Sequence, residues 1–211
     1  MRLANHLTKI ALVLGTLPLA ALAGDNGTVY TQLSTNGLGI GYAASVAPNW
    51  AVRGQYNTLP KQKFSGDVGD FGPGSAMTVE VDWNSVQIVG DWYPLGDGFR
   101  VTGGAVANNN KITVNGTGQV DGVNGTVNAE VKMSDGLTPY LGIGYGMKPK
   151  ADKGLGFNMD LGIMFQNPKA TLTATGGPSA TNIANEQREM QDAVDKLKYF
   201  PVLSFGISYS F

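Results

Sequence analysis

Side chains that commonly carry enzymatic chemistry are scarce in this chain of 211 residues. It contains no cysteine, and its only histidine is His6, close to the N-terminus. A serine nucleophile is usually activated by a histidine base, so the chain beyond residue 6 cannot build a Ser-His-acid site. A zinc site would have to consist of carboxylates alone, which is unusual. We therefore expect no enzyme, no catalytic residue, no metal and no cofactor.

The remaining acidic residues suggest little more. Asp121, Asp135 and Asp152 lie in glycine-containing segments, where a weak calcium site is conceivable. Their spacing matches no calcium-loop motif, which favours solvated turn residues. The 15 basic and 16 acidic residues form no basic patch, so no nucleic-acid partner is expected.

The alternation of polar and apolar residues places one group of four charged residues on matching faces: Arg53, Asp91, Arg100 and Asp160. Each lies on the polar face of an alternating segment, opposite large apolar residues. Asp91 and Arg100 flank one short turn, which predicts a similar depth on adjacent strands. Two interpretations stay open: an ion-pair network that fills a narrow barrel, and a charge gate across a thin pore.

The last eleven residues identify the kind of element that positions these charges. From residue 203, large apolar side chains occupy every second position, and small, mostly polar ones occupy the others. Phe205, Ile207, Tyr209 and Phe211 end this pattern. An alternating strand with a terminal aromatic is typical of an outer-membrane β-barrel, with the apolar face toward lipid and the polar face inside. The stretch resembles the C-terminal signal read by the barrel-assembly machinery.

The N-terminus predicts export from the cytoplasm. Arg2 and Lys9 precede an apolar run from Ile10 to Leu22, and Ala21 and Ala23 form a small-x-small cleavage site. We expect residues 1–23 to be a signal peptide and residues 24–211 to be the barrel domain. Removing two basic residues from 15 leaves 13 against 16 acidic ones, a net charge of −3. No later segment approaches the ~20 apolar residues that a membrane helix needs.

Seven further segments predict strands. Alternation is clear near residues 38, 50, 77, 99, 139 and 155, and residues 28–34 supply the eighth strand if Asn36-Gly37 forms a hairpin turn. The alternative at that point is one long bulged strand. A shift of the apolar parity between Trp83 and Val86 predicts a bulge near residues 84–85. Single-chain bacterial barrels favour even numbers, so the fold class is an all-β, antiparallel transmembrane barrel of eight strands.

Two long segments and one helix complete the predicted organisation. Residues 61–75 suggest an exposed loop, and residues 108–136 suggest projecting strand ends joined by a long external loop, with 111–114 and 126–132 pairing. Residues 169–175 continue as strand. Apolar residues at Ile183, Met190, Val194 and Leu197 have helical spacing, which predicts an amphipathic helix over about 182–198. Its narrow stripe favours packing at the barrel mouth or interior over the membrane surface.

Several stretches together resemble a known family. They are residues 90–100, residues 139–146, residues 172–176 and the acidic helix that runs into residues 198–211. They resemble a family of small, mostly uncharacterised proteobacterial outer-membrane β-barrel proteins, similar to OmpA- and OmpW-like barrels. The resemblance implies a barrel in the outer membrane of a Gram-negative bacterium, in contact with its lipid. It implies no reaction.

Two function classes follow from this pattern. The first is a non-enzymatic barrel with a structural or surface-interaction role that displays its long external segments. The second is a porin-like narrow channel or carrier for a small solute. Eight strands leave little open lumen, which favours the first. The pattern indicates neither a ligand nor an oligomeric state.

Overall fold

The computed structural model describes residues 27–67, 75–120, 123–147, 153–176 and 180–211. The predicted signal peptide with Ala21 and Ala23, together with Asp121 and Asp152, lies outside these ranges. No helix within them is long and apolar enough to cross a membrane.

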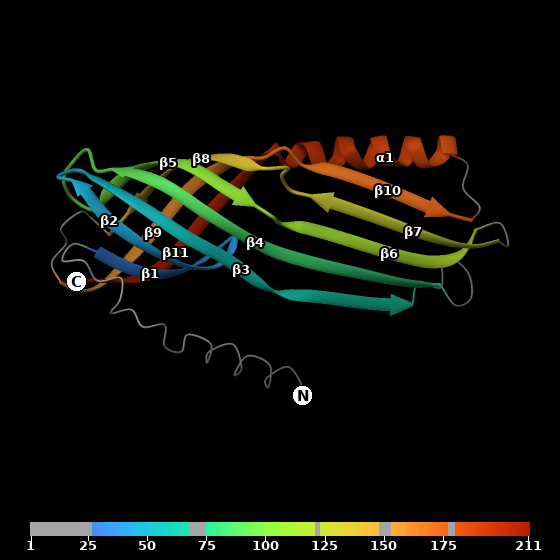
Figure 1. Ribbon diagram of the computed structural model, residues 1–211, viewed down its shortest axis with the longest axis horizontal. Coiled ribbons are helices and arrows are strands. Elements are labelled where there is room, and N and C mark those ends of the chain that lie inside the picture. The colour runs from blue at the N-terminus through green and yellow to red at the C-terminus, as the bar shows by residue number, and fades with distance from the viewer. Residues whose placement is uncertain (1–26, 68–74, 121–122, 148–152, 177–179) are drawn as a thin grey trace, which may run out of the picture.

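Eight antiparallel strands form a closed barrel, which confirms the predicted fold class (Figure 1). The strands pair in the order β4-β3-β2-β1-β11-β9-β8-β5, and pairing of β4 with β5 closes the ring. The barrel strands are β1 (Gly27–Ser34), β2 (Gly37–Ala47), β3 (Trp50–Asp67), β4 (Ala76–Trp92), β5 (Phe99–Asn108), β8 (Leu137–Tyr145), β9 (Gly154–Phe165) and β11 (Tyr199–Ser210).

The hairpin alternative at residues 35–37 is correct. β1 and β2 pair from Gly27↔Ala44 to Ser34↔Gly37, so the chain reverses at Thr35 and Asn36. Gly37 has a φ of 103°, a left-handed conformation that glycine adopts without steric cost. The turn therefore supplies the eighth strand.

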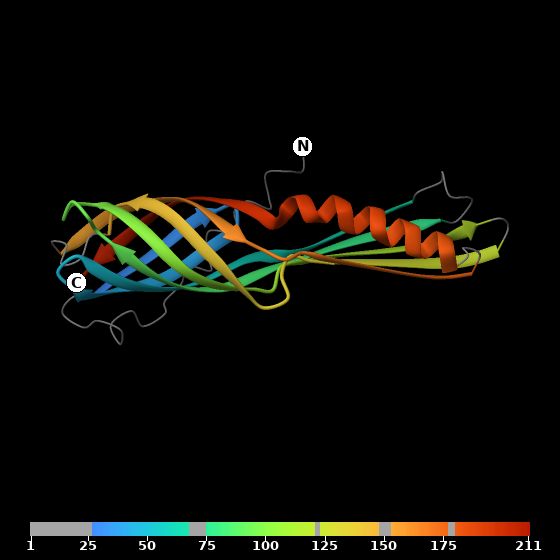
Figure 2. The ribbon, with the colours of Figure 1, turned by 90° about the horizontal axis from the view of Figure 1, so that it is seen from above.

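A flat five-stranded sheet continues from one wall of the barrel (Figure 2). It contains the distal halves of β3 and β4, together with β6 (Lys111–Val120), β7 (Val123–Lys132) and β10 (Lys169–Thr175). β4 pairs with β5 along Ser85–Trp92 and changes to β6 along Ala76–Asp82, so the sheet leaves the barrel between these two stretches. We call this five-stranded sheet the extension.

The extension corrects two predictions. The loop predicted over residues 61–75 is wrong for residues 61–67, which belong to β3; residues 68–74 lie outside the described residues. Residues 108–136 contain a long hairpin, β6–β7, in place of a long external loop. The predicted pairing of residues 111–114 with the segment 126–132 is confirmed, because 111–114 pair with 129–132. Glycine, aspartate and serine in these segments suggested loops, but neighbouring strands supply the backbone hydrogen bonds that keep them extended.

The bulge expected near residues 84–85 is also absent from that position. β4 pairs without interruption to β5 and to β6, and the register shift lies in β3, between Leu59 and Gln62. Pro60 falls within this shift, where a residue without an amide proton removes no ladder hydrogen bond. The apolar side chains of β4 change face where the strand passes from the barrel into the extension.

The predicted helix forms as α1 (Ala180–Val194), followed by the 3-10 turn η4 (Asp195–Lys198). It packs along β10, at the edge of the extension, and not in the barrel mouth or interior as expected (Figure 2). The Gln191 side chain accepts a hydrogen bond from the Ala170 amide (2.8 Å) and donates one to the Pro168 carbonyl (3.0 Å). The helix thus covers a sheet edge that would otherwise expose unpaired backbone groups.

Candidate functional site: a filled barrel and an open sheet

The interior charges predicted from parity meet in one buried network. Arg53 lies 2.5 Å from Asp91 and 3.2 Å from Asp160, and Arg100 lies 2.7 Å from Asp160. All four side chains are at most 4% exposed. Two guanidinium groups and two carboxylates cancel in charge, which offsets the cost of removing each from water.

Neighbouring groups add further hydrogen bonds to this charge layer. Thr102 donates to Asp91 (2.6 Å), Ser204 donates to Asp160 (3.2 Å), and Arg100 donates to the Gly146 carbonyl (2.5 Å). A Cβ at Gly144 would lie 2.6 Å from the Asp160 carboxylate, so glycine is required where the network touches the wall. The charge layer is therefore held in place by side chains and backbone groups of the barrel itself.

An apolar layer follows the charges along the barrel. Five inward side chains from five strands form it: Val89, Val106, Tyr140, Met164 and Val202. Phe200 packs against this cluster and lies 6.5 Å, between ring centroids, from Trp83 at the start of the extension. This layer was not predicted from the sequence, although each member has inward parity, because isolated apolar residues on a polar face form no distinctive pattern.

A third layer of amides closes the end of the barrel nearest the extension. Asn36 donates to Ser85 (2.7 Å), Asn110 donates to Asn36 (2.9 Å), and Asn57 donates to Ser85 (3.2 Å). Asn108 also donates to Gln166 (2.6 Å). These residues come from the β1–β2 turn, three barrel strands and the segments that follow β5 and β9, so only the closed barrel brings them together.

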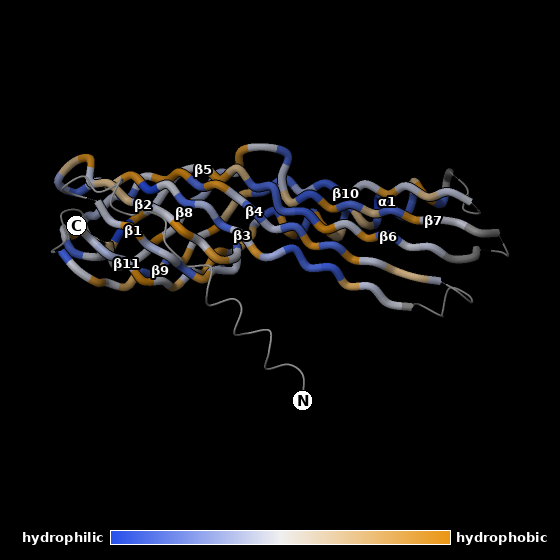
Figure 3. Tube along the Cα trace, turned by 60° about the horizontal axis from the view of Figure 1, so that its bottom comes forward, coloured by the Kyte–Doolittle hydropathy of each residue, from blue (hydrophilic) through white to orange (hydrophobic). Residues whose placement is uncertain are grey.

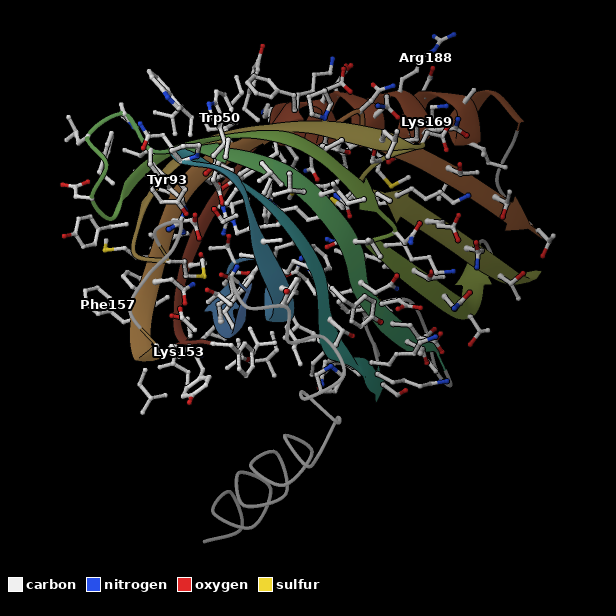
Figure 4. The ribbon with its side chains drawn as sticks, turned by 60° about the vertical axis from the view of Figure 1, so that its left-hand side comes forward. Trp50, Tyr93, Lys153, Phe157, Lys169 and Arg188 are labelled. Atoms are coloured by element: carbon white, nitrogen blue, oxygen red, sulfur yellow. The ribbon has the colours of Figure 1, made fainter. Side chains whose placement is uncertain are left out.

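Outward side chains of the barrel have the opposite character. Large apolar residues stand exposed on all eight strands, from Leu33 on β1 to Tyr209 on β11. Hydrophobic and hydrophilic positions alternate along the barrel strands (Figure 3). Aromatic pairs mark both ends of this belt: Trp50 with Trp92 and Tyr145 with Phe157 at one end, and Phe165 with Tyr199 at the other. Trp50 and Phe157 are labelled at the end away from the extension in Figure 4.

The predicted assembly residues lie on this same outer surface. Phe205, Ile207 and Tyr209 are exposed on β11, and the Phe211 ring meets Tyr209 edge-on at 5.2 Å between centroids. The Phe211 amide donates to the Gly27 carbonyl (3.0 Å), so the last residue is held beside the first strand. The C-terminus therefore lies at the barrel seam between β1 and β11.

The extension has one apolar and one polar face. Residues directly opposite in register share a face, so Phe64, Val79, Val114, Ala129 and Leu172 form one apolar row across its five strands. The next row, on the opposite face, is Lys63, Glu80, Thr113, Glu130 and Thr171. Part of the apolar face is uncovered, because Phe64 is 59% exposed and Val127 is 40% exposed.

Among the described residues, no group of three His, Cys, Asp or Glu side chains lies close enough to hold a metal ion. Asp135 lies beside Lys169, whose hydrogen bond holds the pKa of that carboxyl below its usual value. It is a surface ion pair.

No family model matches the chain, and no curated protein matches its sequence. Among solved structures, CarO2 from Acinetobacter baumannii is similar with a TM-score of 0.59 and 19% identity, over 88% of this chain and 98% of that one. CarO from the same organism gives 0.58 and 22%, over 90% and 99%. A major outer membrane protein from Thermus thermophilus matches at 0.37 and 15%, over 90% and 100%. The two CarO structures confirm the barrel fold.

Proposed function

We propose that the protein is an outer-membrane β-barrel that conducts no steady current and holds the extension outside the cell as an interaction surface, without enzymatic activity. The exposed apolar belt supports a membrane location, because water would meet large apolar side chains on every barrel strand. A closed barrel pairs its backbone groups internally, as the hydrocarbon core requires. Aromatic pairs at both ends of the belt fit the two membrane interfaces.

The direction of insertion follows from the connections. At the end that contains Phe211, β2 joins β3 and β4 joins β5 through short turns. At the other end, β6, β7, β10 and α1 are inserted between barrel strands. Bacterial barrels have short periplasmic turns and long extracellular connections, so the extension faces outward.

The filled interior favours the structural or surface-interaction barrel over the channel or carrier. A charge layer, an apolar layer and an amide layer occupy the bore one after another, and most of their side chains are less than 5% exposed. An eight-stranded barrel has an interior that side chains can fill. A continuous water path through the apolar layer would require these side chains to move apart.

Planar-bilayer recording tests this proposal. We expect no steady single-channel current from the unmodified protein. A variant that combines Val106→Gly, Tyr140→Gly and Met164→Gly removes most of the apolar layer and should conduct, which shows that the assay detects an opened bore. Heat-modifiable migration in detergent checks that both proteins form barrels. Large, stable currents from the unmodified protein would support the alternative, a narrow channel or carrier for a small solute.

Because the chain has no cysteine, single introduced thiols can test the orientation. Thr113→Cys on β6 should react with a membrane-impermeant maleimide on intact cells. Asp97→Cys, in the turn between β4 and β5, should react only after the cells are broken. The reverse pattern would place the extension in the periplasm.

Assembly by the barrel-assembly machinery is a further part of the proposal, supported by the terminal pattern and by the position of Phe211 at the seam. Phe211→Asp should reduce insertion without reducing export. Phe64→Asp makes the same chemical change on the extension and should leave insertion unchanged. Equal outer-membrane levels of both variants would contradict the role of Phe211.

A further inference from the structure

A row of lysines crosses the base of the extension. Direct register partners link Asp82 of β4 to Lys111 of β6, Lys111 to Lys132 of β7, and Lys132 to Lys169 of β10. Lys61 of β3 joins the other side of the row, with its amine 2.8 Å from the Asp82 carboxylate. We call Lys61, Lys111, Lys132 and Lys169 the lysine row.

The lysine row lies on the outer face of the wall. Asp82 has the same parity along β4 as Val86 and Ile88, which are exposed on the outside of the barrel. Since register partners share a face, the lysines of β6, β7 and β10 stand on this outer side as well. Lys61, Lys132 and Lys169 are all more than half exposed, and Figure 4 shows Lys169 near the start of the extension.

The height of the row matches the lipid headgroups. Val86 is the last large apolar residue on the outer face of β4, and Asp82 follows four residues further along. Four residues span about 13 Å along a strand. The strand tilt of a membrane barrel reduces this to a height of about 10 Å. Headgroups occupy roughly 5–8 Å on each side of the hydrocarbon core, within reach of a lysine side chain directed toward the membrane.

The charges in the row are incompletely matched. Like charges directly opposite on neighbouring strands are unfavourable, and Lys111, Lys132 and Lys169 stand in that relation. Glu130 lies 3.5 Å from Lys132, and Asp135 pairs with Lys169. Lys111, between Asp82 and Lys132, makes no salt bridge to any residue that the structure describes. An external anion at this level would reduce the repulsion within the row.

We propose that the lysine row binds the phosphate groups of anionic lipids in the outer leaflet. The inference rests on the proposed membrane location and deepens it, because the row is continuous with the lipid-facing belt and complementary in charge to a phosphate layer. A basic residue near an anionic membrane surface favours binding by about fivefold. Glu130 and Asp135 reduce this for their partners, so three lysines together should give at least about a tenfold preference.

Lipid retention after release from vesicles tests the proposal. The full chain is inserted into vesicles of equal parts phosphatidic acid and phosphatidylcholine, and the lipids that it retains are counted by native mass spectrometry. The unmodified protein should retain phosphatidic acid over phosphatidylcholine by at least about tenfold. A variant that combines Lys111→Gln, Lys132→Gln and Lys169→Gln should lose most of this preference. Retention of the full preference by that variant would overturn the proposal.

A charge-matched control separates position from net charge. Combining Lys63→Gln, Lys153→Gln and Arg188→Gln removes the same number of positive charges outside the lysine row, and this variant should keep the lipid preference. Equal losses in both variants would overturn the assignment to the row. Loss of the preference in about 10 mM inorganic phosphate would also overturn it, because the row would then be a site for free anions. Failure of the unmodified protein to insert, seen as unchanged gel migration on heating, would reject the membrane location itself.

Discussion

The barrel and the extension share strands but have opposite polarity. In the barrel half of β4, Ile88 points outward and is 63% exposed, while Asp91 points inward and is fully buried. In the extension half of the same strand, Glu80 is on the outer face and Val79 is on the inner face. The strand continues without a bulge, so the backbone does not cause the exchange.

With the barrel in the membrane, as proposed, the surrounding medium decides which face is apolar. In the proposed membrane location, the outer face of the barrel contacts lipid. The buried polar groups of the interior must then pair with one another in networks of hydrogen bonds and ion pairs. Beyond the membrane the outer face meets water, and apolar residues gather on the inner face, partly under α1. One strand can serve both regions because its two faces are chemically independent.

The largest expected effect comes from breaking the charge layer. Arg100→Ala removes the 2.7 Å contact to Asp160 and leaves one positive charge beside the two buried carboxylates of the charge layer. Such a change typically costs about 3–5 kcal/mol of unfolding free energy. Urea titration of the barrel in detergent, followed by gel migration, measures the loss.

Two controls sharpen that comparison. Lys63→Ala breaks the exposed 2.9 Å pair with Glu80 on the extension and should change stability little, because water screens the pair. Combining Arg100→Met with Asp160→Asn should recover part of the loss, since no charge then lacks its partner. Equal destabilisation by Arg100→Ala and Lys63→Ala would contradict a structural role for the buried network.

A lysine placed on one face of β4 should have different effects in the two regions. Ile88→Lys puts a charge on the lipid-facing surface and should cost about 2–4 kcal/mol if Ile88 lies near the bilayer midplane. Thr78→Lys puts the same charge on the same face of the extension, where only a hydroxyl contact to Ser65 is lost. Folding yield in vesicles compares the two variants, and equal yields would contradict the exchange of polarity.

Removing the contact between α1 and the edge strand β10 should have a smaller, local effect. Gln191→Ala leaves the Ala170 amide and the Pro168 carbonyl without these partners, at a cost of about 1–3 kcal/mol. Hydrogen exchange at the Ala170 amide should accelerate while exchange in β9 stays unchanged. Glu189→Ala, on an exposed position of the same helix, is the matched control. No change at Ala170 would show that the glutamine does not protect this edge.

Acid should have the smallest effect, confined to the outer face of the extension. Hydrogen bonds from Lys61 and Lys63 hold the pKa values of Asp82 and Glu80 below their usual range. A lowered folded-state pKa gives stability that is present at neutral pH and lost as pH falls through that pKa, here below about pH 4. Circular-dichroism melting should show a slight fall in melting temperature there. Lys61→Met should reduce this pH dependence, and an unchanged dependence would contradict the assignment.

Alternation by itself determined much of this protein. Because side chains along a strand point to opposite faces, parity alone predicted that Arg53, Asp91, Arg100 and Asp160 share the barrel interior. The count of alternating segments and the preference of bacterial barrels for even numbers favoured eight strands, while the turn at Asn36-Gly37 stayed open until the structure showed it. The 3.6-residue spacing predicted α1 to within a few residues of its bounds.

Only the tertiary structure decided which face of each strand segment points inward and which strands become neighbours. The parity change between Trp83 and Val86 suggested a bulge. An alternating pattern distinguishes two faces of a strand but does not show whether the apolar face points inward or outward. The continuation of β3 to Asp67 depends on β4, and β4 depends there on β6. The β4–β6 pairing joins residues that are distant in sequence, such as Ala76 and Thr117, and so do the amide layer and the lysine row. Their members have no local signal, because each residue acquires its role only from partners that the closed sheet places beside it.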